Sequence, residues 1–171
     1  ALPIWDKNNR NPSPPQWINP LEFEIIEIGN MVFHPEKYYY IGTPDARLKD
    51  AKGSDKWKIL QEGKFMRFQS ANGYILKIDH YEETDLNIFK NNKISFNLKT
   101  DDKTFPSNKY GDPNAYYRSV WAVIPASPGS NWFFVKNARY RTHYVHKKDN
   151  EPKYEAIEYS LGAQVFIEEV K

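Results

Sequence analysis

The chain of 171 residues carries a formal net charge of +2 at pH 7, and 16% of its residues are aromatic. Its length suits one domain with a substantial core. Its aromatic content excludes a disordered chain, which lacks the apolar surface needed to offset its ordering entropy. No run approaches the roughly 20 apolar residues of a membrane-spanning helix, so we expect a soluble protein. The nearly balanced charge gives no reason to expect a nucleic-acid partner.

The sequence contains no cysteine, which excludes disulfides, a thiol nucleophile and cysteine-based metal sites. The chain opens on Ala1-Leu2-Pro3, without a Met and without the pattern of a signal peptide. We expect a protein secreted after cleavage. A trimmed chain and a cytoplasmic location stay open as alternatives.

Residues 1–20 contain five prolines and almost no periodicity, so they predict an extended arm outside the domain. From residue 21 onward come short pieces rich in β-branched and aromatic residues, each bounded by Gly, Pro, Asn or Asp. No segment of helical length has a 3.6-residue period. About twelve such pieces predict one all-β domain over residues 21–171: LEFEII, NMVF, YYYIG, KFMRFQ, GYILKI, LNIF, ISFNL, VWAVI, WFFVK, HYVH, YEAIEY and QVFIEEV.

One pattern occurs three times in this region: an aromatic strand, then Tyr-[Ile/Val]-x-x-x-Asp, then an aromatic residue or Val two places before an aliphatic one. The repeats cover about residues 21–60, 61–124 and 125–171. The Tyr–Asp signals lie at residues 40–45, 74–79 and 144–149. The middle repeat carries an insertion at about residues 90–118, which is polar and rich in turn residues. We expect a surface loop or an added hairpin there.

Three units of about four strands each predict a β-trefoil, a six-stranded barrel capped by three hairpins. One such unit cannot bury its aromatic face alone, but three units around a threefold axis bury theirs jointly. The closing signal of each repeat should then point inward, and its partner two places on should share that face because strand side chains alternate. The pairs are Trp57 and Ile59, Trp121 and Val123, and Val165 and Ile167.

The closing stretches DKWKI, SVWAVI and AQVFIEE resemble the ends of ricin-B type lectin repeats, which close in Gln-x-Trp; Gln164 lies one place from that position. KFMRFQSANGYILKID is similar to the mid-repeat turn of that family, of clostridial haemagglutinin components and of amaranthin-type agglutinins. The resemblance covers about residues 21–171 and implies a β-trefoil lectin. In that family a carboxylate of the turn holds sugar hydroxyls. Here Lys77 and Lys147 take the equivalent places, with the Asp two residues later.

Two loops combine aromatic rings with Asp or Asn, the makeup of a sugar site, in which a ring stacks on the sugar and polar atoms fix its hydroxyls. The first repeat offers no aromatic residue in its loop. The alternative is that each Asp caps a turn and each Tyr packs on its own hairpin. The candidate sugar-binding residues are Asp79, His80, Tyr81 and Asn87 in one loop and Asp149, Asn150 and Tyr154 in the other.

Residues 136–148 form one basic run in which cations and His alternate with Tyr. Such a run suits a sulfated or sialylated glycan, a phosphate-rich surface or single-stranded nucleic acid, and the alternative is a solvated hairpin. Alternation along one strand would place Arg139, Arg141 and His143 on a single face. The candidate residues for an anionic ligand are Lys136, Arg139, Arg141 and His143.

The sequence holds no Gly-x-Ser-x-Gly elbow, phosphate-binding Gly-rich loop or His-Glu-x-x-His motif. His143 and His146 are three places apart, which sends them to opposite faces of a strand and makes them poor partners for one metal. We therefore expect a binding protein without catalytic residues, metal or cofactor.

The leading prediction is a lectin that binds glycans or glycoproteins, alone or as the receptor-binding component of a toxin or adhesin. Partner chains would dock on the arm or on the 90–118 insertion. The alternative is a trefoil-type protease inhibitor, whose loop at 101–118 offers Lys103 or Lys109 as a trypsin-type anchor. A trefoil that contacts only protein is a third, weaker interpretation.

Overall fold

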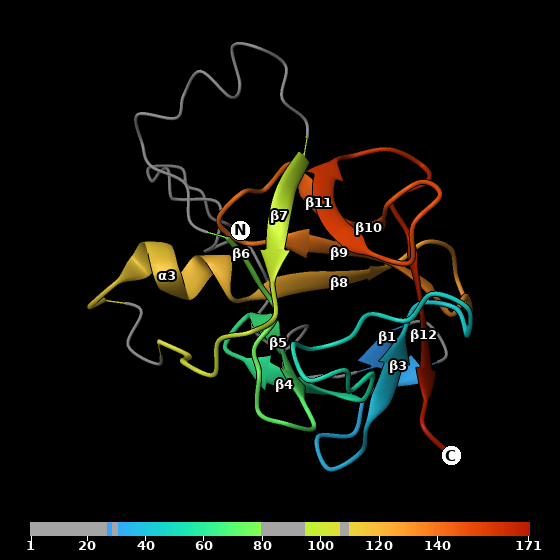
Figure 1. Cartoon of the computed structure of the whole chain (residues 1–171), viewed down its shortest axis with the longest axis horizontal. Helices are drawn as coiled ribbons and strands as arrows, with labels where there is room; N and C mark the ends of the chain where they lie inside the picture. Colours follow the sequence, from blue (N-terminus) through green and yellow to red (C-terminus); the bar gives the residue numbers. More distant parts are fainter. Residues whose placement is uncertain (1–26, 29–30, 80–94, 107–109) are drawn as a thin grey trace, which may run out of the picture.

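Short β-strands follow one another along the chain, as its β-branched and aromatic residues predict. The computed structural model describes residues 27–28, 31–79, 95–106 and 110–171 (Figure 1). The predicted site residues His80, Tyr81 and Asn87, the arm at 1–20 and Lys109 lie outside the described residues. The elements in chain order are β1 (Glu27–Ile28), β2 (Met31–Val32), β3 (Tyr39–Ile41), β4 (Trp57–Glu62), β5 (Phe65–Ser70), β6 (Lys77–Ile78), β7 (Ser95–Lys99), α3 (Pro113–Arg118), β8 (Trp121–Pro125), β9 (Trp132–Asn137), β10 (His143–Lys147), β11 (Tyr154–Glu158) and β12 (Val165–Glu169). This confirms the all-β prediction.

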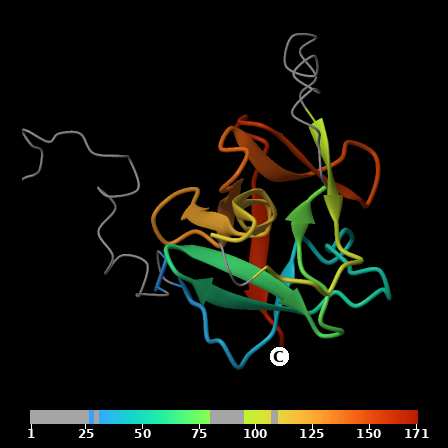
Figure 2. The ribbon, with the colours of Figure 1, turned by 90° about the vertical axis from the view of Figure 1, so that its left-hand side faces the viewer.

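Ten strands form one antiparallel sheet in the order β12-β3-β4-β5-β8-β9-β10-β11-β7-β6, and β1 and β2 form a separate pair. Strand β12 pairs with β3 on one side and with β9 on the other. The strands β12, β3, β4, β5, β8 and β9 thus form a cycle of pairings, in which each has a neighbour on both sides. The remaining strands β10, β11, β7 and β6 extend the sheet from β9. In both views β10 and β11 lie at one end of the molecule and the C-terminus lies at the other (Figures 1 and 2).

The core contains the side chains that alternation predicts to point inward. Trp57, Trp121 and Val165 are buried, as are Ile59 and Ile167, while Val123 is half-buried against the core. The two indoles are held in the same way. Trp57 Nε1 donates to Leu48 O at 3.0 Å, and Trp121 Nε1 donates to Leu76 O at 3.1 Å.

The two indole bonds align the first and second repeats differently from the Tyr–Asp signals. Because Leu48 and Leu76 each accept a hydrogen bond from the closing Trp of their repeat, Leu48 corresponds to Leu76. The residues equivalent to Tyr74 and Ile75 therefore directly precede Leu48. Tyr40 and Ile41 instead belong to β3, one strand earlier, which pairs with β12. The reason is that a Tyr-Ile pair indicates only a half-buried strand and does not specify which strand of a repeat it belongs to.

Residues 90–118 contain regular structure in their described part. Strand β7 pairs with both β6 and β11, and its Phe96 is buried in the core. The short helix α3 begins at Pro113 and is capped by Asp112, whose side chain accepts a hydrogen bond from Ala115 N at 3.1 Å. Both are favoured helix starts, but six residues are too few to show a helical period.

Candidate functional site

Four polar side chains form a row across the strands that extend from β9. His146 of β10 pairs with Glu155 of β11, and Glu155 pairs with Asn97 of β7. Asp79, directly after β6, donates its backbone N–H to Asn97 O at 2.9 Å, which continues the β6–β7 register. Residues paired in an antiparallel sheet project from the same face. We call these four residues the polar row.

The polar row lies on the outer face of the sheet. The neighbouring residues Val145, Ala156 and Phe96, which alternate with it along β10, β11 and β7, are buried in the core. Within the row, His146 Nδ1 lies 3.2 Å from Glu155 Oε2, and these side chains are 17% and 19% exposed. Asn97 is exposed and Asp79 is half-buried. The row therefore presents two carboxylates, an amide and an imidazole to one side.

Acidic groups gather at the β6–β7 end of the polar row. Lys99 Nζ lies 3.1 Å from Asp101 Oδ1. The hydrogen bond and charge of Asp101, with further charge from Asp79 and Asp102, raise the pKa of the Lys99 amine. The Asp79 carboxylate therefore lies close enough to the Lys99 amine for their charges to interact.

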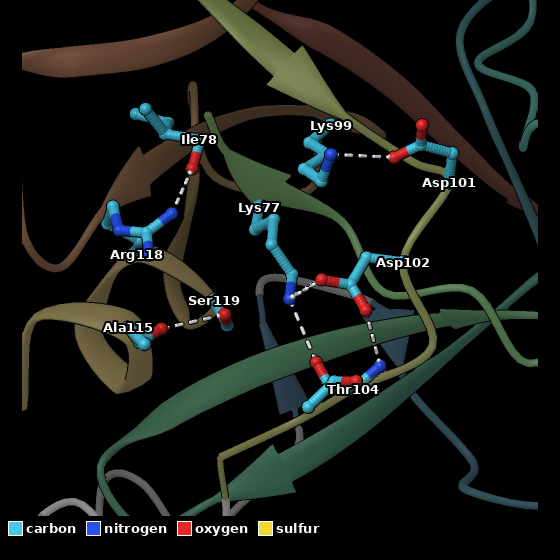
Figure 3. A network of polar contacts seen from close by, with 9 residues as sticks. All are labelled: Lys77, Ile78, Lys99, Asp101, Asp102, Thr104, Ala115, Arg118 and Ser119. Atoms are coloured by element: carbon cyan, nitrogen blue, oxygen red, sulfur yellow. Dashed lines mark hydrogen bonds and ion pairs between the residues drawn. The ribbon is translucent and has the colours of Figure 1, made fainter. Parts of the chain in front are cut away.

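Lys77, two positions before Asp79, links β6 to the segment that follows β7 (Figure 3). Its side chain is only 8% exposed, and its Nζ donates to Thr104 O at 2.8 Å and to Asp102 Oδ2 at 3.3 Å. The backbone N–H of Thr104 lowers the pKa of Asp102 against the opposing effect of burial, and Lys77 lowers it further. Arg118 Nη1 donates to Ile78 O at 2.9 Å and ties α3 to β6.

Lys147 has the same kind of role in the third repeat. Its Nζ donates to Lys148 O at 2.8 Å and to Glu151 O at 3.1 Å, both in the turn between β10 and β11. The two lysines that stand where the lectin resemblance places a carboxylate therefore hold backbone carbonyls of the loops beside them.

The three candidate residues of the third repeat do not gather at one place. Asp149 and Asn150 are exposed in the β10–β11 turn, where Asn150 has a φ of 63°. Tyr154 instead reaches the first repeat, where its hydroxyl donates to Ala46 O and lies against Gly42, whose φ of 104° and crowding exclude a side chain. Burial, with a smaller effect of the Asp45 charge, raises the pKa of the Tyr154 hydroxyl to about 12.

The structure also separates the residues of the basic run. Lys136 lies on β9, but residues 138–142 form bends and turns, so the expected alternation on one strand is wrong there. The Arg139 guanidinium lies 4.9 Å from the centre of the Tyr140 ring, and Arg141 is exposed. His143 is fully buried and stacks on Phe96 with ring centres 4.3 Å apart.

Of the two proposed inhibitor anchors, only Lys103 is described. It is exposed, and its Nζ lies 5.2 Å from the centre of the Tyr74 ring. The later part of the 101–118 segment forms α3. In the described part of the chain, no three His, Asp or Glu side chains come close enough to hold a metal ion. None of its helices has the length and apolar character needed to cross a membrane.

Sequence reasoning missed Asn97, Glu155 and His146 as site residues. Period-two alternation in Tyr154-Glu155-Ala156 could have placed Glu155 on an outer face, since Ala156 is buried. The neighbour of Glu155 could not have been found, because Asn97 comes from a strand 58 residues earlier in the sequence.

Comparisons with known proteins bear on the fold. No protein-family model matches the chain, and no curated protein sequence matches it. A salivary protein from Culex quiquefasciatus of the Cysteine and Tryptophan-Rich family matches in structure with a TM-score of 0.54 and 12% identity, over 80% of this chain and 98% of that one. A GlcNAcα1-4Gal-releasing endo-β-galactosidase from Clostridium perfringens matches with a TM-score of 0.51 and 11% identity, over 80% of this chain. The lysenin pore matches with a TM-score of 0.49 and 11% identity, over 85% of this chain and 51% of that one.

The present chain spans 33% of the galactosidase, so that enzyme is a much larger protein. At these identities the likeness concerns the fold.

Proposed function

We propose that this protein is a carbohydrate-binding protein and that the polar row is its glycan site. The observation that carries the proposal is the register that places Asp79, a sugar-binding candidate from the sequence, in line with Asn97, Glu155 and His146. Sugar hydroxyls both donate and accept hydrogen bonds. Carboxylates accept them, an amide does both, and a neutral imidazole donates from one ring nitrogen and accepts at the other. Strands lie about 4.8 Å apart, so a row across four strands extends over about 14 Å, enough for a short oligosaccharide.

An aromatic ring lies beside the polar row. Tyr144 precedes His146 by two positions on β10 and so projects from the same face. Its ring packs edge-on against Phe134 and Tyr159, with centres 5.8 and 5.5 Å apart. An aromatic surface next to hydrogen-bonding groups suits the apolar side of a sugar ring.

We propose further that the architecture is a β-trefoil. Two features support this: the cycle of pairings through β3, β4, β5, β8, β9 and β12, which would be the six-stranded barrel, and the hairpins β6–β7 and β10–β11, which would be caps of the second and third repeats. The galactosidase with a similar fold is named for releasing a saccharide, which agrees with a carbohydrate ligand. The ligand would be a glycan or glycoprotein met outside the cell, bound without catalysis, by a lectin acting alone or within a toxin or adhesin.

A glycan array probed with the intact protein, at physiological and at high salt, tests the proposal. Binding should survive high salt, because hydrogen bonds and stacking depend little on screening. Asn97→Ala and Glu155→Gln should each lower the affinity for the glycan by about 10-fold to 100-fold. This is the loss expected when one or two hydrogen bonds to a partly charged site are removed.

The matched control is Glu158→Gln, which makes the same change at an exposed residue of β11. Glu158 is three positions from Glu155 and so does not share its face of the strand. This variant should leave glycan binding unchanged. If Asn97→Ala and Glu155→Gln bind every glycan as the parent does, the polar row is not the site. A blank array with the parent protein would overturn the carbohydrate proposal itself.

A further inference from the structure

Large apolar side chains are exposed on the outer side of the cycle of strands. Trp132 is 40% exposed, Ile124 is 42%, Tyr159 is 56% and Leu161 is 75%. Among the described residues only one other large hydrophobic side chain, Tyr110, is this exposed. Single exposed apolar residues are ordinary, but a contiguous group of them marks an interaction site.

These side chains form one surface. Ile124 of β8 pairs with Phe134 of β9, and Trp132 of β9 pairs with Phe166 of β12, so all four project outward together. The Trp132 and Phe166 rings are 5.4 Å apart, centre to centre, as are those of Phe134 and Tyr159. We call Ile124, Trp132, Phe134, Tyr159 and Phe166, together with the exposed Leu161 two positions after Tyr159 in the chain, the aromatic face.

Cations border the aromatic face on one side. Lys136 occupies the next outward position of β9 after Phe134. The turn that follows contains Arg139 and Arg141, and it lies beside Tyr159 because Tyr159 N donates to Thr142 O at 3.1 Å.

Glu168, the next outward residue of β12 after Phe166, lies at the far end of the aromatic face from this border, because β12 runs antiparallel to β9, and it is held by Arg47 Nη2 at 3.2 Å. One carboxylate of the described residues does lie near the border. Glu158 is exposed beside Tyr159. Lys136, Arg139 and Arg141 outnumber the Glu158 carboxylate here, so the described residues of this border carry a positive formal charge.

We propose that the aromatic face docks on a membrane surface that carries anionic lipid headgroups. Trp and Tyr prefer the boundary between headgroups and acyl chains, because one part of the ring is apolar and the other is polar. Leu161 and Ile124 would enter the acyl boundary, while Lys136, Arg139 and Arg141 face lipid phosphates.

Co-sedimentation with lipid vesicles tests this proposal. The intact protein should sediment with vesicles of phosphatidylcholine mixed with phosphatidylserine, and added salt should reduce the bound fraction. Leu161→Glu and Trp132→Ala should each weaken binding by about tenfold, because they remove inserted apolar groups. Arg141→Glu should weaken binding to the mixed vesicles and leave the weak binding to phosphatidylcholine alone unchanged.

Two controls separate this surface from the others. Tyr110→Ala removes an even more exposed ring, three positions before the start of α3, and should bind vesicles as the parent does. Glu155→Gln should weaken glycan binding and keep vesicle binding, so failure of one proposal can be told from failure of the other.

Three results would overturn the membrane proposal. The first is no sedimentation with either kind of vesicle. The second is equal binding to both kinds, unaffected by Arg141→Glu, which would exclude recognition of anionic headgroups. The third is a dimer in light scattering that Leu161→Glu converts to a monomer, because a second copy would then cover the aromatic face.

Discussion

His143 and His146 lie three positions apart on β10 and occupy opposite faces of the sheet. His143 is fully buried, stacks on Phe96, and has an Nε2 without a hydrogen-bond partner among the described residues. His146 lies in the polar row, 3.2 Å from the Glu155 carboxylate. The inner face is thus filled by packing, which fixes stability, and the outer face presents polar groups that a ligand can use. Changes on the two faces should therefore separate stability from binding.

The largest effect is expected from two adjacent residues of β7. Phe96→Ala removes a fully buried ring that contacts both His143 and Tyr140, and should lower the free energy of unfolding by about 3–5 kcal/mol. Asn97→Ala changes the next residue, on the outer face, and should change stability by less than about 0.5 kcal/mol. Urea unfolding followed by tryptophan fluorescence measures both. Equal losses in the two variants would contradict the assignment of the two faces.

The next effect is the dependence of stability on pH. Burial lowers the pKa of His143 below 6.5, although the Glu158 charge opposes this. Below pH 6.5 the unfolded chain therefore binds a proton that the folded chain does not, so stability should fall with decreasing pH, by at most about 1.4 kcal/mol per pH unit. Well above pH 6.5 the imidazole of His143 is neutral in both the folded and the unfolded chain, so the free energy of unfolding no longer depends on pH through this group. The free energy of unfolding measured between pH 5 and 8 reports the slope.

His143→Phe sharpens this test. Phenylalanine keeps the stacking on Phe96 and removes the unpaired buried Nε2, so this variant should be about as stable as the parent near pH 7.5. It should be the more stable of the two near pH 5.5. His146→Gln is the matched control and should keep the parent's slope. An unchanged slope in His143→Phe would show that another group causes it.

The sequence predicts the inner face well. The repeated closing signal places Trp57, Trp121 and Val165 in the core, and alternation adds their partners two positions on, because burial imposes a period of two on each strand. It also places the two histidines of β10 on opposite faces. These are local properties, which a single strand expresses without its neighbours.

The outer site could not be predicted in the same way. The polar row depends on the registers of β7 against β11 and β6, which join distant residues and are fixed by the whole sheet. The basic run shows a second limit. Asn137 Oδ1 accepts the backbone N–H groups of Arg139 and Tyr140, and this turn ends the strand on which the alternation of Arg139, Arg141 and His143 depended.

The smallest effect is expected within the polar row. A double-mutant cycle of His146→Gln and Glu155→Gln should give a coupling free energy below about 1 kcal/mol at pH 7, because a single pair near the surface gains little over its hydration. Urea unfolding of the parent, both single variants and the double variant measures it. A coupling above about 2 kcal/mol at pH 7 would make the pair a structural element. The loss of glycan binding in Glu155→Gln could then be explained by a disturbed sheet, so Asn97→Ala would become the decisive variant for the site.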